Sequence, residues 1–316
     1  MISQSRRCFL RRAAAAVGAA VALPLADVRF PRPAFGADTK PKWKFAICNE
    51  TFKDWPFQKA CALAAECGYQ GIEIAPFTIS DFVTDIPAAK RSEVRRQAEQ
   101  AGLEVIGLHW LLARTSIFHL TTPDHLVRQK TIEYLRLLAR LCADLGGKIL
   151  VFGSPKQRDL LPGVTRANGM KYAAAVFQSV MPTLEKLGLV LAIEPLGPKD
   201  TNFITTAADG AELVRMVASP QCRLHLDCKA MATEPTPIPD LIRRHYAMLA
   251  HFHANDSNLQ GPGFGKLDFV PIFRALDEVG YRGWVSVEVF DYTPGPERLA
   301  RDSIRYMQKC LAKLAK

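Results

Sequence analysis

The chain has 316 residues, of which 48% are hydrophobic, with 41 lysines and arginines against 31 aspartates and glutamates. This apolar fraction excludes a disordered polymer and predicts a packed core, and no internal repeat points to a solenoid. Half of the formal charge of +10 belongs to residues 1–37, which hold six arginines and one aspartate. The rest of the sequence is mildly basic, so its charge gives no sign of a nucleic-acid partner.

The N-terminal segment resembles a twin-arginine export signal. Arg6 and Arg7 precede an alanine-rich apolar run over 13–26, which is short for a helix that crosses a membrane. We therefore expect residues 1–37 to be a twin-arginine (Tat) signal peptide. The mature protein would then act in the periplasm, with no membrane contact after the signal is removed.

From about residue 44 the sequence alternates between short apolar runs and longer amphipathic segments. The runs that predict strands are 45–50, 71–75, 104–110, 148–153, 189–194, 222–227, 250–254 and 284–290. The segments that predict helices are 57–67, 87–101, 123–145, 166–187, 207–218, 238–248, 269–279 and 296–314. Strict alternation of eight such pairs predicts an α/β fold, a single (β/α)8 TIM barrel over 44–316. The alternative is a doubly wound open sheet, but no G-x-G-x-x-G motif follows the first strand.

Acidic or imidazole side chains lie at the ends of seven predicted strands: Glu50, Glu73, His109, Glu194, Asp227, His251 with His253, and Glu288. In a TIM barrel these ends form the mouth where functional side chains gather. Carboxylates held this close repel each other, so the pattern indicates a divalent cation among them. Each residue taken alone could instead form a salt bridge or cap a loop.

The last four strands supply a set of three carboxylates and one imidazole: Glu194, Asp227, His253 and Glu288. Such an oxygen-rich set suits Mn²⁺, Mg²⁺ or Co²⁺ better than a structural Zn²⁺ site, which prefers thiolates. We expect Mn²⁺ as the cofactor, with Mg²⁺, Co²⁺ and Zn²⁺ as the other candidates.

Five segments carry a family resemblance: AIEPL at 192–196, LHLD at 224–227, HFHANDSN at 251–258, GPGFG at 261–265 and WVSVE at 284–288. They resemble the xylose isomerase-like sugar isomerases and epimerases, above all the D-tagatose 3-epimerase and D-psicose 3-epimerase group. The resemblance implies that Glu194, Asp227, His253 and Glu288 bind the metal. It implies that Glu194 and Glu288 are also catalytic and exchange protons with the sugar, and that Asp200 contacts the substrate.

Two positions depart from the pattern of the free-ketose epimerases. That group carries a substrate-binding His three residues after the Asp ligand and an Arg six residues after the His ligand, where this chain has Ala230 and Leu259. A site that loses two polar contacts is expected to take a different substrate. Lys229 either replaces one of these contacts or is a solvated loop lysine.

Three further side chains are substrate-binding candidates. Glu73 and His109 end strands two and three, and Arg158 follows strand four. Glu73 either binds substrate or braces a neighbouring side chain. A lone histidine in an apolar strand is as often a packed core residue. We expect His251 to face away from His253 and to have a structural role.

The leading hypothesis is a metal-dependent sugar isomerase or epimerase that abstracts a proton next to a carbonyl. Its partner would be a small carbohydrate, with no nucleic acid, and the chain could form a homo-oligomer. The alternatives are a lyase or dehydratase acting on a 3-keto-glycoside or keto-cyclitol through the same metal–enolate site, and a sugar-binding barrel without catalysis. A DNA-repair endonuclease is disfavoured because it needs further histidines, including one where Ala230 stands.

Overall fold

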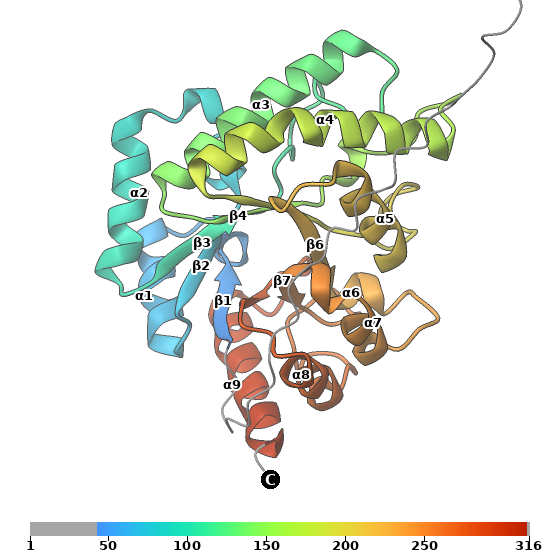
Figure 1. The fold of residues 1–316 in the computed structure, drawn as a ribbon. Coiled ribbons are helices and arrows are strands. Elements are labelled where there is room, and N and C mark those ends of the chain that lie inside the picture. The colour runs from blue at the N-terminus through green and yellow to red at the C-terminus, as the bar shows by residue number, and fades with distance from the viewer. Residues whose placement is uncertain (1–42, 315–316) are drawn as a thin grey trace, which may run out of the picture. The chain divides into compact units, whose positions relative to one another are not determined.

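The computed structural model describes residues 43–314, so the predicted leader lies outside the described residues. Eight parallel strands close into a barrel in the order of the sequence, and the helices lie around it (Figure 1). The strands are β1 (Lys44–Cys48), β2 (Gly71–Ile74), β3 (Glu104–Leu108), β4 (Ile149–Phe152), β5 (Val190–Ile193), β6 (Cys222–Asp227), β7 (Leu249–Ala254) and β8 (Trp284–Val287). Pairing of β1 with β8, with Ile47 opposite Val287, completes the barrel. The predicted fold is confirmed.

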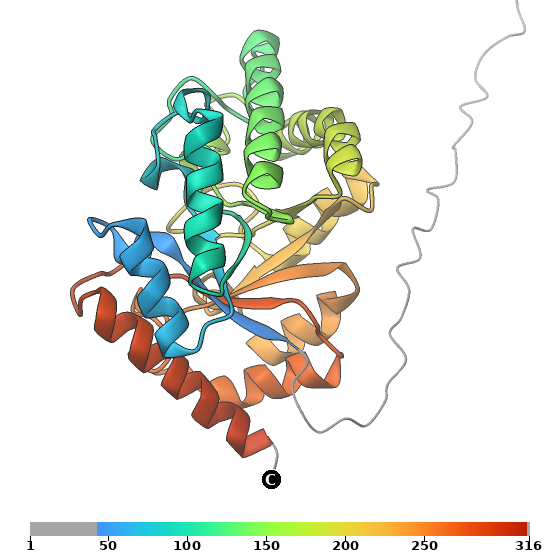
Figure 2. The same ribbon diagram turned by 90° about the vertical axis from the view of Figure 1, so that its left-hand side faces the viewer.

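Nine α-helices are found in the described part of the chain. They are α1 (Phe57–Cys67), α2 (Ala88–Gln100), α3 (His125–Asp144), α4 (Arg166–Leu187), α5 (Ala207–Val217), α6 (Cys228–Met231), α7 (Ile238–His245), α8 (Phe269–Glu278) and α9 (Pro296–Leu314). The last helix, α9, packs beside α1, so the outer ring of helices closes where the barrel closes (Figure 2). None of the helices in this described range has both the length and the apolar character needed to cross a membrane.

Local sequence signals explain where the helices begin and end. Thr165 caps the start of α4 by accepting a hydrogen bond from the backbone of Asn168, and Gly188 ends the helix with a φ of 63°. A capping box between Thr206 and Asp209 starts α5.

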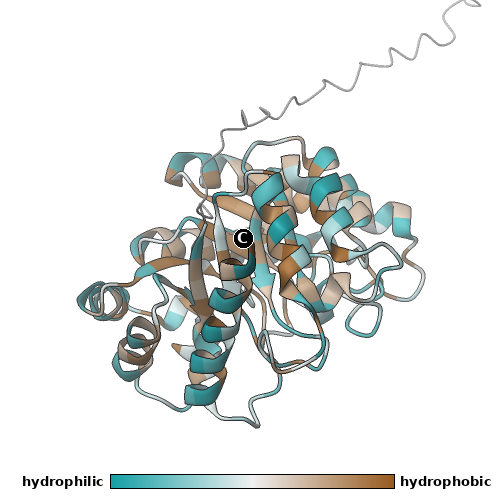
Figure 3. Cartoon of the chain, turned by 90° about the horizontal axis from the view of Figure 1, so that it is seen from below, coloured by the Kyte–Doolittle hydropathy of each residue, from teal (hydrophilic) through white to brown (hydrophobic). Residues whose placement is uncertain are grey.

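Apolar side chains fill the space between the strands and the helices. Phe152 of β4 meets Phe177 of α4 with ring centroids 5.0 Å apart, and both rings are buried. Figure 3 shows the central strands as mainly hydrophobic and the outer sides of the helices as mainly hydrophilic. This pattern is what a parallel barrel covered by amphipathic helices requires.

The structure differs from the sequence prediction mainly at the carboxyl ends of the strands. Strands β1, β3 and β8 stop two or three residues earlier than predicted, so Glu50, His109 and Glu288 lie just beyond the ladder. The short helix α6 was not predicted. Asp227 starts it by accepting a hydrogen bond of 2.7 Å from the backbone of Ala230. The backbone at the mouth of the barrel therefore depends on side-chain contacts, which the hydropathy pattern does not predict.

Candidate active site

A small cavity of about 70 Å³ opens at the carboxyl ends of the strands. It is lined by residues that follow β3, β4, β5, β6 and β8: Trp110, Gly153, Ser154, Pro155, Glu194, Leu196, Asp200, Lys229, Glu288 and Phe290. The rings of Trp110 and Phe290 meet edge to face, with centroids 6.1 Å apart, and form an aromatic wall. The cavity thus combines an apolar wall with a few charged groups, the usual composition of a small-molecule site.

The predicted metal ligands meet beneath this cavity. Ligand atoms of Glu194, Asp227 and His253 lie within 4.8 Å of one another, together with a ring nitrogen of His225. Glu288 joins through His253, whose Nδ1 is 2.9 Å from Glu288 Oε2 and 3.9 Å from Glu194 Oε1. All five side chains are buried. The structure therefore brings together all four predicted residues and adds His225, which the sequence analysis missed.

The carboxylates of this cluster lie close together and repel one another when they are ionised. Burial raises the pKa of Asp227 to about 7, and the carboxylates of Glu194 and Glu288 add to the shift. Burial also raises the pKa of Glu194. For His253, burial lowers the pKa, but the carboxylates of Glu288 and Glu73 outweigh it and the net shift is upward. Acidic groups that resist ionisation at close range fit a site whose missing positive charge is supplied by a divalent cation.

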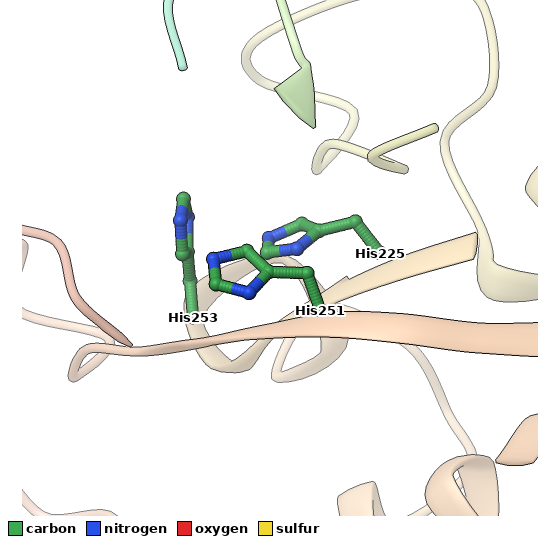
Figure 4. Close-up of side chains that lie close together, drawn as sticks. All are labelled: His225, His251 and His253. Atoms are coloured by element: carbon green, nitrogen blue, oxygen red, sulfur yellow. The ribbon is translucent and has the colours of Figure 1, made fainter. Parts of the chain in front are cut away.

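A second layer of polar side chains lies deeper in the barrel. The rings of His225, His251 and His253 point to the same side of their strands (Figure 4), and all three are buried. Our expectation that His251 faces away from His253 was wrong, because residues two apart on a strand share a face. The same rule, applied to β6, would have found His225 two residues before Asp227.

Glu73 connects these imidazoles and does not face the cavity. Its Oε2 lies 2.9 Å from His251 Nε2 and 3.2 Å from His253 Nε2. Burial favours the neutral carboxyl, but the two histidines outweigh it and hold the pKa of Glu73 well below its usual range. Of the two roles expected for Glu73, substrate binding and bracing a neighbour, these contacts fit the second. Its depth in the barrel makes it a brace that turns His253 so that Nδ1 meets the carboxylates above.

His109 and Arg158 are also buried away from the cavity. His109 Nε2 lies 2.7 Å from Glu50 Oε2, and its neighbour Trp110 takes the place at the cavity wall that we expected for the imidazole. The guanidinium of Arg158 donates to the carbonyl oxygens of Glu194 at 2.6 Å and Ile204 at 3.1 Å. These bonds fix the loop after β5, so Arg158 does not act as a clamp on the ligand.

Asp200 and Lys229 line the cavity. Lys229 Nζ lies 2.9 Å from Asp200 Oδ2. Burial lowers the pKa of Lys229, but the carboxylates of Asp227 and Asp200 outweigh it and raise the pKa above its usual value. Nearby, the methyl group of Ala230 is buried, and Leu259 is 42% exposed outside the cavity lining. Neither Ala230 nor Leu259, the two positions that differ from the free-ketose epimerases, supplies a polar group to the cavity.

Known proteins share this architecture. Residues 61–310 match a family model described as a xylose isomerase-like TIM barrel. A probable ketose 3-epimerase of Synechocystis sp. is 26% identical over 295 residues, which cover 86% of this chain and 98% of that protein.

Two solved structures are similar at the level of the fold. A crystal structure of D-psicose 3-epimerase in the presence of D-fructose has a TM-score of 0.75 at 21% identity and covers 85% of this chain and 99% of that one. A 3-keto-D-glucoside 4-epimerase from E. coli has a TM-score of 0.74 at 20% identity, with 85% and 100% covered.

Proposed function

Since this chain belongs to the xylose isomerase-like TIM-barrel family, we propose that it is a metal-dependent sugar epimerase or isomerase. A relative that aligns over nearly its whole length is named a probable ketose 3-epimerase. The observation that carries the proposal is that Glu194 and Glu288 line one cavity and both approach the same ring nitrogen of His253, Nδ1. Two carboxylates at one small cavity are suited to move a proton off and onto a carbon atom.

The metal ligands in this proposal are Glu194, Asp227, His253 and Glu288. When bound, a divalent cation, for which Mn²⁺ is our first candidate, polarises a carbonyl and the adjacent hydroxyl and so acidifies the neighbouring C–H bond. Asn255 supports the site, because its Nδ2 donates to Asp227 Oδ2 at 2.5 Å. This bond orients the carboxylate toward the cluster.

The two glutamates divide the proton transfer. One accepts the proton from one face of the sugar carbon, and the other returns a proton to the opposite face, which inverts that carbon. Burial raises the pKa of Glu194 in the metal-free chain, and a bound cation would oppose this shift and favour the carboxylate that accepts a proton. Trp110 and Phe290 form an apolar wall of the cavity and limit the contact of water with the deprotonated sugar on that side.

The test is proton exchange at a sugar carbon. Mn²⁺-loaded protein is incubated in D₂O with neutral ketoses, and deuterium entry is followed by NMR. We expect exchange with the wild type and a loss of about 10²-fold or more in Glu194→Gln and Glu288→Gln. Glu99→Gln, a change on an exposed face of α2, is the matched control and retains full exchange. Metal-loaded wild-type protein that exchanges no substrate proton contradicts the proposal and favours a sugar-binding barrel.

One observation keeps an elimination reaction as the second candidate. Ala230 and Leu259 remove two polar contacts of the free-ketose epimerases, so the substrate can differ from a free ketose. Proton abstraction next to a ketone can also expel a group from the β position, as a lyase or dehydratase on a 3-keto-glycoside or keto-cyclitol would require. Release of the aglycone or of water from such a substrate, with no deuterium retained in a ketose product, favours elimination.

We also propose that residues 1–37 direct export through the twin-arginine route. The proposal rests on the Arg6–Arg7 pair and the apolar run that follows it. Replacement of both arginines by lysine should leave the protein in the cytoplasm of the producing cell, as measured by fractionation. Periplasmic protein in this variant would contradict the assignment.

A further inference from the structure

We infer that Lys229 and Asp200 form a single specificity element, a neutral clamp that binds two neighbouring hydroxyl groups of an uncharged sugar and rejects a phosphate or carboxylate at that position. The inference deepens the proposed function and rests on it, because it concerns the same cavity. It gives Lys229 one of the polar contacts that Ala230 and Leu259 cannot make.

The first observation is that Lys229 is held in place from three sides. Its backbone N–H donates to Asn255 Oδ1 at 2.7 Å, and its ammonium lies 4.3 Å from the centroid of the Phe290 ring. The same ammonium is 2.9 Å from Asp200 Oδ2, and the Lys229 side chain is only 13% exposed. A freely solvated loop lysine would show none of these restraints.

The second observation is the charge balance of the cavity. Among the described residues that line it, Lys229 is the one cationic side chain, and Arg158 is bound to backbone carbonyls behind the wall. Asp200 already neutralises Lys229. The three carboxylates of Glu194, Asp227 and Glu288 together carry more negative charge than a divalent cation neutralises, so an anionic substituent would have to displace Asp200 and would meet no surplus positive charge.

A hydroxyl group does not have to displace Asp200, and it brings no further negative charge into the cavity. A hydroxyl is both a donor and an acceptor, so one hydroxyl can accept a hydrogen bond from the ammonium while its neighbour donates one to the Asp200 carboxylate. The ion pair stays intact and no net charge is buried. Such a pair can recognise adjacent hydroxyls on a sugar.

The test compares D-fructose with D-fructose 6-phosphate, together with D-psicose and D-tagatose as further neutral probes. Binding to the Mn²⁺-loaded full chain is measured by calorimetry. We expect the wild type to bind at least one neutral ketose and to bind the phosphate more weakly. Lys229→Met should weaken the neutral ketose about 10-fold or more, the loss that follows from one hydrogen bond to a charged group.

Asp200→Asn gives the sharper result, because it keeps the size of the side chain and releases the charge of Lys229. We expect this variant to lose affinity for the neutral ketose and to gain affinity for the phosphate, so that the preference falls or reverses. The double variant should lose little more than either single variant, because the two residues act as a unit. Lys199→Met, an exposed neighbour in the same loop, is the matched control and should bind like the wild type.

Three results would overturn the inference: neutral ketoses that bind equally to Lys229→Met, an unchanged preference in Asp200→Asn, or a wild type that prefers the phosphate. Failure of the proposed function looks different. In that case the binding preferences follow the pattern above, but no solvent deuterium enters any bound sugar.

Discussion

Replacement of Glu73 by glutamine tests whether the deep polar layer supports the metal site. Glu73 is fully buried, and its Oε2 contacts both His251 Nε2 and His253 Nε2. Because that contact occupies one ring nitrogen of His253, the other, Nδ1, faces Glu288 at 2.9 Å. Glutamine keeps the shape but removes the negative charge, and its NH₂ group cannot accept a hydrogen bond.

The expected loss of Mn²⁺ affinity in Glu73→Gln follows from the removal of the carboxylate that contacts His253. A carboxylate behind a ligating imidazole fixes its orientation and increases its basicity, and its removal typically costs 10- to 100-fold in metal affinity. Two short contacts to one buried oxygen place Glu73 toward the upper end of that range. We expect a Mn²⁺ dissociation constant about 30- to 100-fold above that of the wild type. Glu73→Asp, which keeps the charge, should recover part of the loss.

Metal affinity is measured by competition with a fluorescent chelator, and folding is followed by circular dichroism. Glu104→Gln is the matched control, since Glu104 is an exposed residue that pairs with Lys44 at the start of β3 and should bind Mn²⁺ normally. A folded Glu73→Gln protein whose Mn²⁺ affinity lies within about 2-fold of the wild type would refute the bracing role.

Three further predictions follow from the same cluster. The pKa of Asp227 is raised from its ordinary 3.8 to about 7, so protonation of Asp227 stabilises the metal-free fold at low pH, and this stability is lost as the pH rises toward 7. The increase in Tm on adding Mn²⁺ should therefore be larger at about pH 8 than at about pH 5.5. An equal increase in Tm at both pH values would contradict the pKa shift of Asp227. A Cβ at Gly153 would lie 2.3 Å from Glu194 Oε2, so Gly153→Ala should lower kcat by about 10-fold or more while the protein stays folded; unchanged kinetics would show that Glu194 has room to move without loss. Arg158→Met removes two bonds to buried carbonyls and should lower the free energy of unfolding by about 2–4 kcal/mol in urea titrations, whereas stability unchanged within error would show that these bonds contribute nothing.

The fold could be predicted because each element carries its own signal. Helices α1, α4 and α9 begin and end where the sequence pattern placed them, and Gly68 and Gly188 end α1 and α4 in the left-handed conformation. The unpredicted helix α6 has only four residues, too few to show a helical period in the sequence. It starts where the side chain of Asp227 accepts a hydrogen bond from the backbone N–H of Ala230, and a hydropathy pattern does not show such a bond.

The site could be predicted in part for a related reason. In a barrel, the position of a residue at a strand end decides whether it reaches the mouth, so Glu194, Asp227 and His253 were found from spacing. The length and packing of a side chain decide whether it faces the cavity or the interior. Arg158 turns back to backbone carbonyls, and Glu73 lies too deep to meet a ligand, and neither outcome is written in the local sequence.

The most direct test of the account is the metal content of the protein and of two ligand variants. After dialysis against excess Mn²⁺ and removal of free metal, elemental analysis should find about one Mn²⁺ per wild-type chain and almost none in Asp227→Asn or His253→Gln. Asp277→Asn, at a position near the end of α8, should keep the wild-type content. A wild-type protein that exchanges substrate protons without stoichiometric metal, or ligand variants that retain it, would contradict the assignment of this cluster as a cation site.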